Sequence, residues 1–201
     1  MEGWRRAISP IVGVALMVIL TVLIASVLAA GVLPMGNDLD TGPFDKAINP
    51  WSGKSGDLVR VSDQSAGATD VRYRVHFNIK SGSDTIGNSL NSVVLEVTTG
   101  SPDMFSPTGQ ANLEKVVIDE GSDGTIDRKI TSDVDGWNVQ NGGSKLKIGF
   151  TGSAYSASAG DSIIIVFGGV TNPADPGVYD VRAQTSGDGN WHAGTIEIIA
   201  G

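Results

Sequence analysis

The acidic residues between positions 119 and 127 form the pattern in this chain that comes nearest to a metal site. In Asp119-Glu-Gly-Ser-Asp123-Gly124-Thr-Ile-Asp127, acids stand at loop positions one, five and nine and glycine stands at position six, as in calcium-binding loops. The segment lacks an acid at position three and a glutamate at position twelve. Asp123-Gly124 also joins two strand patterns, and this dipeptide is typical of hairpin turns. The sequence therefore favours a turn, with calcium binding by Asp119, Asp123 and Asp127 as the alternative.

Few other residues have side chains and spacing that are typical of a catalytic or cofactor-binding site. His76 and His192 lie in separate segments, and we interpret both as surface residues. Gly187-Asp-Gly189-Asn-Trp-His192 begins like a dinucleotide-binding fingerprint but lacks the third glycine, so we interpret it as a hairpin turn. The chain has no cysteine, and it has no serine-hydrolase elbow, zinc-protease pair or phosphate-binding loop. We therefore expect no catalytic activity and no cofactor.

A long apolar segment near the N-terminus determines on which side of a membrane the rest of the chain lies. No ionisable side chain lies between Arg6 and Asp38, and an uncharged apolar run longer than about 18 residues is typical of a helix that spans a bilayer. A helix over residues 8–33 would be about 39 Å long, against about 30 Å of hydrocarbon. Arg5 and Arg6 on its short side predict a cytoplasmic N-terminus and an exported remainder.

The junction before this segment resembles the processing site of archaeal type IV pilins. Arg6-Ala7-Ile8-Ser9-Pro10-Ile11-Val12-Gly13 places a basic residue and a small residue directly before the apolar run. The resemblance implies that a prepilin peptidase cleaves between Ala7 and Ile8, on the cytoplasmic side of the helix. Residues 1–7 would then be a discarded leader. Residues 8–36 would form a helix that is held in the membrane and later packs in the core of a filament.

The composition of the helix is consistent with both environments. A helix that is apolar on all sides is stable in lipid and among copies of itself, because both remove its surface from water. Small residues that would allow close approach between such helices are Gly13, Ala15, Ala25, Ala29 and Gly31. The fifth residue of the implied mature chain is Val12, where bacterial type IV pilins usually have glutamate. We therefore expect no register-setting charge of the bacterial kind.

Other interpretations of the N-terminal segment remain open. A secretory signal peptide has an apolar region of only about 7–15 residues, shorter than this one, although Ala29-Ala30-Gly31 imitates a cleavage site. An uncleaved anchor would make the protein a membrane-anchored extracellular binding module. An archaellin-type filament subunit would share the same helix architecture, and the Ser9-Pro10 junction favours a pilus over it.

The residues after the helix predict an exported all-β head. Glycine and proline among polar residues mark 37–56 as a linker, which leaves 57–201 as the head. Apolar and polar residues alternate over 70–80, the pattern of a half-buried strand. About nine such segments favour a β-sandwich of immunoglobulin-like type over a barrel, and Pro176-Gly177-Val178-Tyr179 resembles a corner of such domains. The predicted strands are 58–61, 70–80, 93–98, 116–119, 126–131, 145–150, 162–167, 178–185 and 195–199.

Charge and family resemblance together indicate the partners. The formal charge is −8, and Glu2, Arg5 and Arg6 give the first 36 residues +1, so the exported part carries −9. Such a surface argues against nucleic acid as a partner. The resemblance implies copies of the same chain, prepilin peptidase and the pilus assembly machinery as partners. The sequence thus predicts a structural subunit that is located in the cell membrane before assembly and in an extracellular adhesive filament afterwards.

Overall fold

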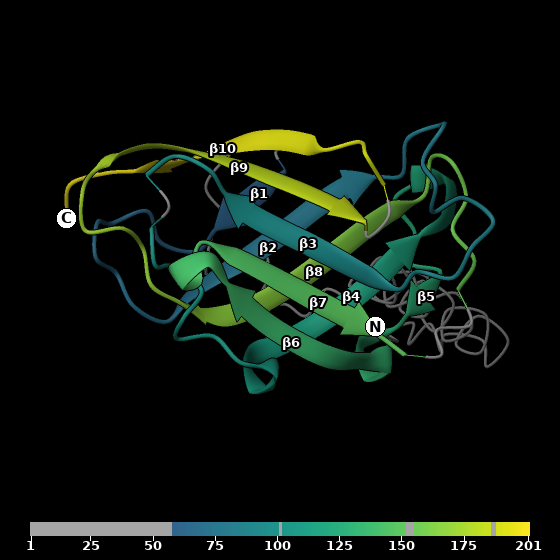
Figure 1. Cartoon of the computed structure of the whole chain (residues 1–201), viewed down its shortest axis with the longest axis horizontal. Coiled ribbons are helices and arrows are strands. Elements are labelled where there is room, and N and C mark those ends of the chain that lie inside the picture. The colour runs from purple at the N-terminus through teal and green to yellow at the C-terminus, as the bar shows by residue number, and fades with distance from the viewer. Residues whose placement is uncertain (1–57, 101, 152–154, 186–187) are drawn as a thin grey trace, which may run out of the picture. The chain divides into compact units, whose positions relative to one another are not determined.

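The head of the protein is a sandwich of two five-stranded antiparallel sheets (Figure 1). The computed structural model describes residues 58–100, 102–151, 155–185 and 188–201. The chain divides into residues 1–50 and 51–201, and every described residue belongs to the second unit. The predicted leader, helix and linker lie outside the described residues. Across the described part of the chain, no helix is both long and apolar enough to cross a membrane.

The two sheets differ in strand order. The first has the order β1-β2-β8-β4-β5, and the second has the order β10-β9-β3-β7-β6. The strands of the first sheet are β1 (Val59–Val61), β2 (Val71–Asn78), β8 (Ser162–Val170), β4 (Leu113–Asp119) and β5 (Arg128–Lys129). Those of the second sheet are β10 (His192–Ile198), β9 (Gly177–Thr185), β3 (Ser92–Val97), β7 (Lys145–Phe150) and β6 (Val134–Gln140).

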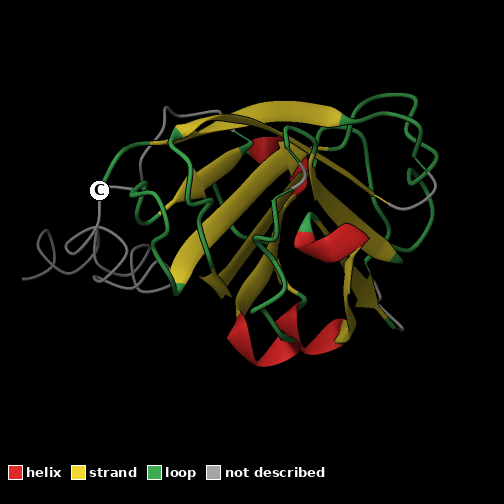
Figure 2. Ribbon diagram, turned by 60° about the vertical axis from the view of Figure 1, so that its left-hand side comes forward, coloured by secondary structure: helices red, strands yellow, loops and turns green. Residues whose placement is uncertain are grey.

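The helical segments in the described residues are short 3-10 turns that lie outside the sheets (Figure 2). They precede or follow strands β4, β6 and β7, and each is three residues long. Their bounds are Gln110–Asn112, Glu120–Ser122, Thr131–Asp133 and Asn141–Gly143.

Alternation of side chains explains how the first sheet forms its apolar face. Along β2, every second residue from Val71 to Phe77 is buried, while Arg72, Arg74 and His76 between them are half-buried. Successive residues of a strand point to opposite sides of the sheet, so the apolar set faces the second sheet. Strand β8 lies between β2 and β4 and is buried along most of its length, as a central strand requires.

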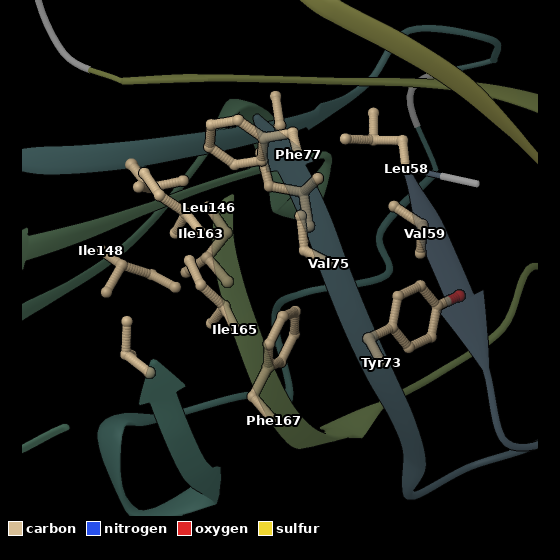
Figure 3. Close-up of a cluster of buried hydrophobic side chains, with 14 of the residues drawn as sticks. Leu58, Val59, Tyr73, Val75, Phe77, Leu146, Ile148, Ile163, Ile165 and Phe167 are labelled. Carbon is tan, nitrogen blue, oxygen red and sulfur yellow. The ribbon is translucent and has the colours of Figure 1, made fainter. Parts of the chain in front are cut away.

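The inner faces of the two sheets meet in one apolar core (Figure 3). Phe167 lies at the centre of an aromatic group within it. Its ring centroid is 5.6 Å from that of Trp137, 6.0 Å from that of Tyr73 and 6.3 Å from that of Phe105. Tilted and edge-on aromatic pairs of this kind contribute about 0.5–1.5 kcal/mol each beyond the area they bury. The core therefore fixes the two sheets together without any disulfide.

The predicted β-sandwich is confirmed. Each of the nine segments predicted as strands overlaps one strand of the head. Strand β6 was not predicted, because Asp135, Gly136 and Asn138 interrupt its apolar residues. A β-bulge between Val134 and Gly136 shifts its pairing with β7, which removes the regular alternation from the sequence.

Candidate functional site

The residues predicted for processing and filament packing precede the described residues. This applies to Arg6, Ala7 and Ile8 and to the small residues of the apolar segment. The structure instead locates three regions of the head in which polar or ionisable side chains gather. They are the acidic loop after β4, a cavity that contains both histidines, and a groove at one end of the sandwich.

The acidic loop is a connection between two paired strands, as the turn interpretation predicts. Strands β4 and β5 pair antiparallel through Val117 with Lys129 and Ile118 with Arg128. The connection is longer than a two-residue hairpin, because a 3-10 turn over Glu120–Ser122 precedes Asp123 and Gly124. Gly124 has φ of +92°, a backbone conformation that glycine adopts without a steric penalty.

The carboxylates of this loop bind backbone amides. Asp119, which is only 7% exposed, accepts hydrogen bonds from the amides of Asp123 and Gly124, both at 2.9 Å. Asp127 accepts one from the amide of Glu120 at 2.7 Å, and Asp123 accepts one from the amide of Thr125 at 2.8 Å. Within the described residues, no group of three acidic or histidine side chains is placed to hold a metal ion. The contacts therefore account for these residues as turn-forming groups.

Both histidines of the chain line one cavity of about 250 Å³, together with Lys80. They were interpreted as separate surface residues, whereas both are half-buried. His192, at the start of β10, stacks on Phe77 with ring centroids 4.8 Å apart. His76, on the opposite face of β2, lies 3.2 Å from the hydroxyl of Ser162 through Nε2. Sequence spacing gave no signal for this arrangement, because β2 and β10 belong to different sheets.

Burial lowers the pKa of both histidines. Desolvation is the largest cause in each case. The positive charges of Arg74 and Arg60 lower the pKa of His76 further, and Lys80 does the same for His192. Asp119 and Asp188 oppose these effects, but the net pKa of both rings is lowered, which favours their neutral form.

Five loops meet at the end of the sandwich opposite Leu58, and we call them the far-end loops. Their described residues are 62–70, 98–100, 102–112, 141–144, 171–176 and 199–201. Backbone hydrogen bonds connect them, from Gly67 to Pro173, from Phe105 to Gly143, from Thr171 to Met104 and from Ala66 to Ile199.

A groove of about 480 Å³, which we call the far-end groove, lies among these loops. Asp103, Thr171, Asn172, Asp175 and Tyr179 contribute to its walls.

Asn172 holds the loops around the groove in place. The residue is 2% exposed. Its Nδ2 donates to the carbonyl oxygens of Asp63 and Ser65 at 2.9 and 3.0 Å, and its Oδ1 accepts from the hydroxyl of Tyr73 at 3.1 Å. A buried amide with all of these bonds made is costly to move, so these bonds hold the two loops against Tyr73.

Tyr179, near the start of β9, also lines the far-end groove. Its hydroxyl donates to the carbonyl oxygen of Asp175 at 2.8 Å, four residues upstream. The bond closes the turn that leads from β8 to β9. The sequence had indicated a corner at Pro176-Gly177-Val178-Tyr179, and the structure confirms the position of the tyrosine there.

The chain thus has an uncharged apolar segment near its N-terminus and a β-sandwich head. Residues 6–43 match the family described as archaeal type IV pilin, N-terminal. The N-terminal region is therefore that of an archaeal type IV pilin, as the junction at Ala7 predicts. No curated protein matches the chain.

Solved structures similar to this chain include one bacterial hydrophobin and two streptococcal adhesins. BslA, a bacterial hydrophobin, is 12% identical with a TM-score of 0.39, over 71% of this chain and 96% of that chain. The N-terminal domain of the Streptococcus gordonii adhesin Sgo0707 is 14% identical with a TM-score of 0.37, over 72% of this chain and 33% of that chain.

The serine-rich repeat adhesion glycoprotein Srr1 from Streptococcus agalactiae is 13% identical with a TM-score of 0.32. The match covers 74% of this chain and 49% of that chain. This chain therefore covers less than half of the length of either streptococcal structure. Similarities at this level carry no information about function.

Proposed function

We propose that this protein is the structural subunit of an archaeal type IV pilus-like surface filament. The match of residues 6–43 to the pilin N-terminal family carries the proposal. In this scheme prepilin peptidase removes residues 1–7, and residues 8–36 pass from the membrane into the filament core. The same apolar surface is shielded from water in both places. The head remains outside, on the cell surface.

The head is proposed to be an immunoglobulin-like domain. Strands β1, β2, β8 and β4 are adjacent in the order of strands A, B, E and D of that fold, and β10, β9 and β3 follow the order G, F and C. Strands β5, β6 and β7 would then be an insertion between D and E. The hydrogen bond from Tyr179 to Asp175 supports the proposal, since immunoglobulin-like domains have a tyrosine corner at the start of strand F.

Adhesion is the role that we propose for the assembled filament. A homopolymer presents the same head many times, so weak contacts of each head add up through avidity. Catalysis forms no part of the proposal, because the acidic loop of the head uses its carboxylates to bind backbone amides.

Two alternatives remain. An archaellin-type subunit would use the same helix in a swimming filament, and loss of swimming after deletion of the gene would identify it. An uncleaved, membrane-anchored binding module would retain residues 1–7 and would not polymerise.

The N-terminal sequence of the protein recovered from the surface of its native host tests the proposal. We expect the chain to start at Ile8 and negatively stained cells to carry filaments that disappear with the gene. Ala7→Trp places a bulky side chain at the predicted cleavage site and should leave the chain starting at Met1. Gly31→Trp is the matched control, because it places a bulky side chain directly before a signal-peptidase cut after Ala29-Ala30-Gly31 but leaves the pilin junction intact.

Each start position has a separate meaning. A wild-type start at Met1 would reject processing and favour the anchored module. A start near Val32 that Gly31→Trp abolishes would identify an ordinary secreted protein. A start at Ile8 without filaments would retain processing and reject self-assembly.

A further inference from the structure

The cavity that contains both histidines, which we call the histidine cavity, has a basic lining in an acidic protein. The formal charge of the whole chain is −8. Among the described residues that line the cavity are His76, His192 and Lys80, and none of them is an aspartate or a glutamate. Charges of one sign in a concave site reinforce one another and raise the local concentration of counter-ions. The histidine cavity therefore favours an anion, although the protein as a whole repels one.

Two arginines add positive charge next to this cavity. Arg60 of β1 lies directly opposite Arg74 of β2, so both side chains lie on the face of the first sheet that also carries His76. Like charges directly opposite each other on paired strands are destabilising. Both arginines are close enough to His76 to lower its pKa. Their charge therefore acts on the group that lines the histidine cavity.

One hydrogen-bond donor at this edge of the sheet lacks an acceptor. Nε of Arg60 is buried, and within the described residues no acceptor reaches it. Buried donors without an acceptor are rare in native proteins, and a bound ion is one of the partners that can satisfy them. This unsatisfied donor is an observation separate from the charge of the cavity. It also indicates that an anionic acceptor is missing here.

The histidine cavity offers further donors. Among the described residues, neither ring nitrogen of His192 has a hydrogen-bond partner, and the ring instead stacks on an aromatic side chain. Nζ of Lys80 donates to the carbonyl oxygen of Trp191 at 3.3 Å, and an ammonium group has three N–H donors. His76 is engaged through Nε2 with the hydroxyl of Ser162. His192 and Lys80 are therefore the groups that can donate to a ligand.

The walls of the cavity are in place before a ligand binds. Leu58 lies against Gly194 of β10, where a Cβ would fall 2.7 Å from the Cβ of Leu58. Phe77 of β2 stacks on His192 of β10, so both contacts join the edges of the two sheets. A site that is already ordered binds with a smaller entropic cost. The cavity of about 250 Å³ also has an apolar part, formed by Leu58, Phe77 and Ala193, which leaves room for a small organic group beside an anion.

From these observations we propose that the histidine cavity binds a phosphate or sulfate group. Lys80 and His192 donate to its oxygens, and Arg60 and Arg74 stabilise its charge. A tetrahedral oxyanion suits this site because it accepts several charge-assisted hydrogen bonds at once. The group is either a free inorganic ion or the ester of a small organic molecule. The binding goes beyond the proposed function and does not require a filament.

Nuclear magnetic resonance of the histidine rings tests the proposal. The chain has two histidines, and both line the cavity, so their ring signals report on the site directly. The full chain in non-ionic detergent micelles is titrated with sodium sulfate. We expect a saturable shift of the His192 signals, whereas sodium chloride at the same ionic strength should give none, since screening alone does not saturate a site.

Two further titrations identify the source of the group. Inorganic phosphate and glycerol phosphate carry the same anionic group, and the second adds a small organic part. Tighter binding of glycerol phosphate would assign the site to an ester, and tighter binding of inorganic phosphate would assign it to the free ion. Either result supports the proposal.

The pH dependence of the ring signals provides a second measurement. Bound sulfate should raise the pKa of both histidines, because a nearby anion favours the protonated ring. Sulfate suits this test since it stays doubly charged throughout the titration of a histidine. The other charges that act on the two rings are present with and without sulfate. They belong to Arg60, Arg74 and Asp119 around His76 and to Lys80 and Asp188 around His192.

Three variants locate the site. Lys80→Gln should weaken sulfate binding by about tenfold, and Arg60→Gln should weaken it by a smaller factor, since it acts through its charge. Lys147→Gln removes an exposed cation of β7 in the other sheet and should leave the affinity unchanged. Lys80→Arg retains the charge and should retain most of the affinity. Thermal melts show whether each variant is folded.

The results that would overturn the proposal are specific. One is the absence of a saturable shift with sulfate, phosphate and glycerol phosphate. The other is an affinity for sulfate that is the same in Lys80→Gln, Arg60→Gln and Lys147→Gln. Because the assay uses unassembled protein, a filament defect leaves its result unaffected, and a negative result leaves the pilin proposal intact.

Discussion

The hydroxyl of Tyr179 donates a 2.8 Å hydrogen bond to the carbonyl oxygen of Asp175, four residues earlier in the chain. This bond closes the turn between β8 and β9, which pass from one sheet to the other. It also holds Asp175 next to the ring of Tyr179 in the far-end groove. One contact thus supports both the crossing between the sheets and the shape of the groove.

Replacement of Tyr179 by phenylalanine should lower the free energy of unfolding by about 1 kcal/mol, the typical value for one neutral hydrogen bond. The ring and its apolar contacts remain, so the change isolates the hydroxyl. Urea denaturation measures the difference. An unchanged midpoint would show that water replaces the bond without loss.

Replacement of Tyr155 by phenylalanine should cost more, about 1.5–3 kcal/mol, because its hydroxyl donates to a charged acceptor. The acceptor is Asp161 at 2.6 Å, and both residues are buried, with exposures of 1% and 3%. The amides of Gly121 and Ser158 also donate to this carboxylate. Urea denaturation of both variants in the same buffer compares their free energies of unfolding. A smaller decrease for Tyr155→Phe than for Tyr179→Phe would contradict the prediction.

Mild acid should destabilise the head through its two histidines. The pKa of His76 and that of His192 are lowered in the folded state, mainly by burial. The unfolded chain therefore takes up these protons at higher pH than the folded chain does. This contribution to stability is complete above about pH 6.5 and is lost as the pH falls towards the folded pKa values. The free energy of unfolding should thus be lower at pH 5.5 than at pH 7.5.

Two substitutions test whether the histidines cause this pH dependence of stability. His76→Gln retains a hydrogen-bonding side chain towards Ser162, and His192→Phe retains an aromatic contact with Phe77. Their combination should flatten the stability profile between pH 7.5 and 5.5. Asp63 and Asp188 have a lowered pKa and respond only below about pH 4. If the double substitution left the stability profile unchanged, groups other than the two histidines would cause its pH dependence.

Calcium should not stabilise the head through the acidic loop. The carboxylates of Asp119, Asp123 and Asp127 already accept backbone hydrogen bonds. We expect the same melting temperature in 5 mM Ca²⁺ and in EDTA, recorded at constant ionic strength. A calcium-dependent rise that Asp127→Asn abolishes would restore the alternative interpretation of this loop as a metal site.

Strand β6 shows where the pattern of the sequence is insufficient. It is an edge strand with few fully buried residues, so its apolar residues do not alternate over its full length. Gly136 faces Gly149 across the pair, and a Cβ at Gly136 would lie 3.3 Å from the Cα of Gly149. This close approach favours glycine where a regular strand would have a larger residue. The glycine interrupts the alternating pattern by which a strand is predicted from the sequence.

The sequence by itself determined the features that depend on neighbouring residues. The uncharged apolar segment, the basic and small residues at its junction and the period-two strands are all local, because burial in lipid or on one face of a sheet requires a local pattern. Tertiary structure alone decided which strands are adjacent, since pairing energy depends on the residues of another strand. It therefore decided that His76 and His192 share a cavity and that Asp103 and Asp175 line one groove.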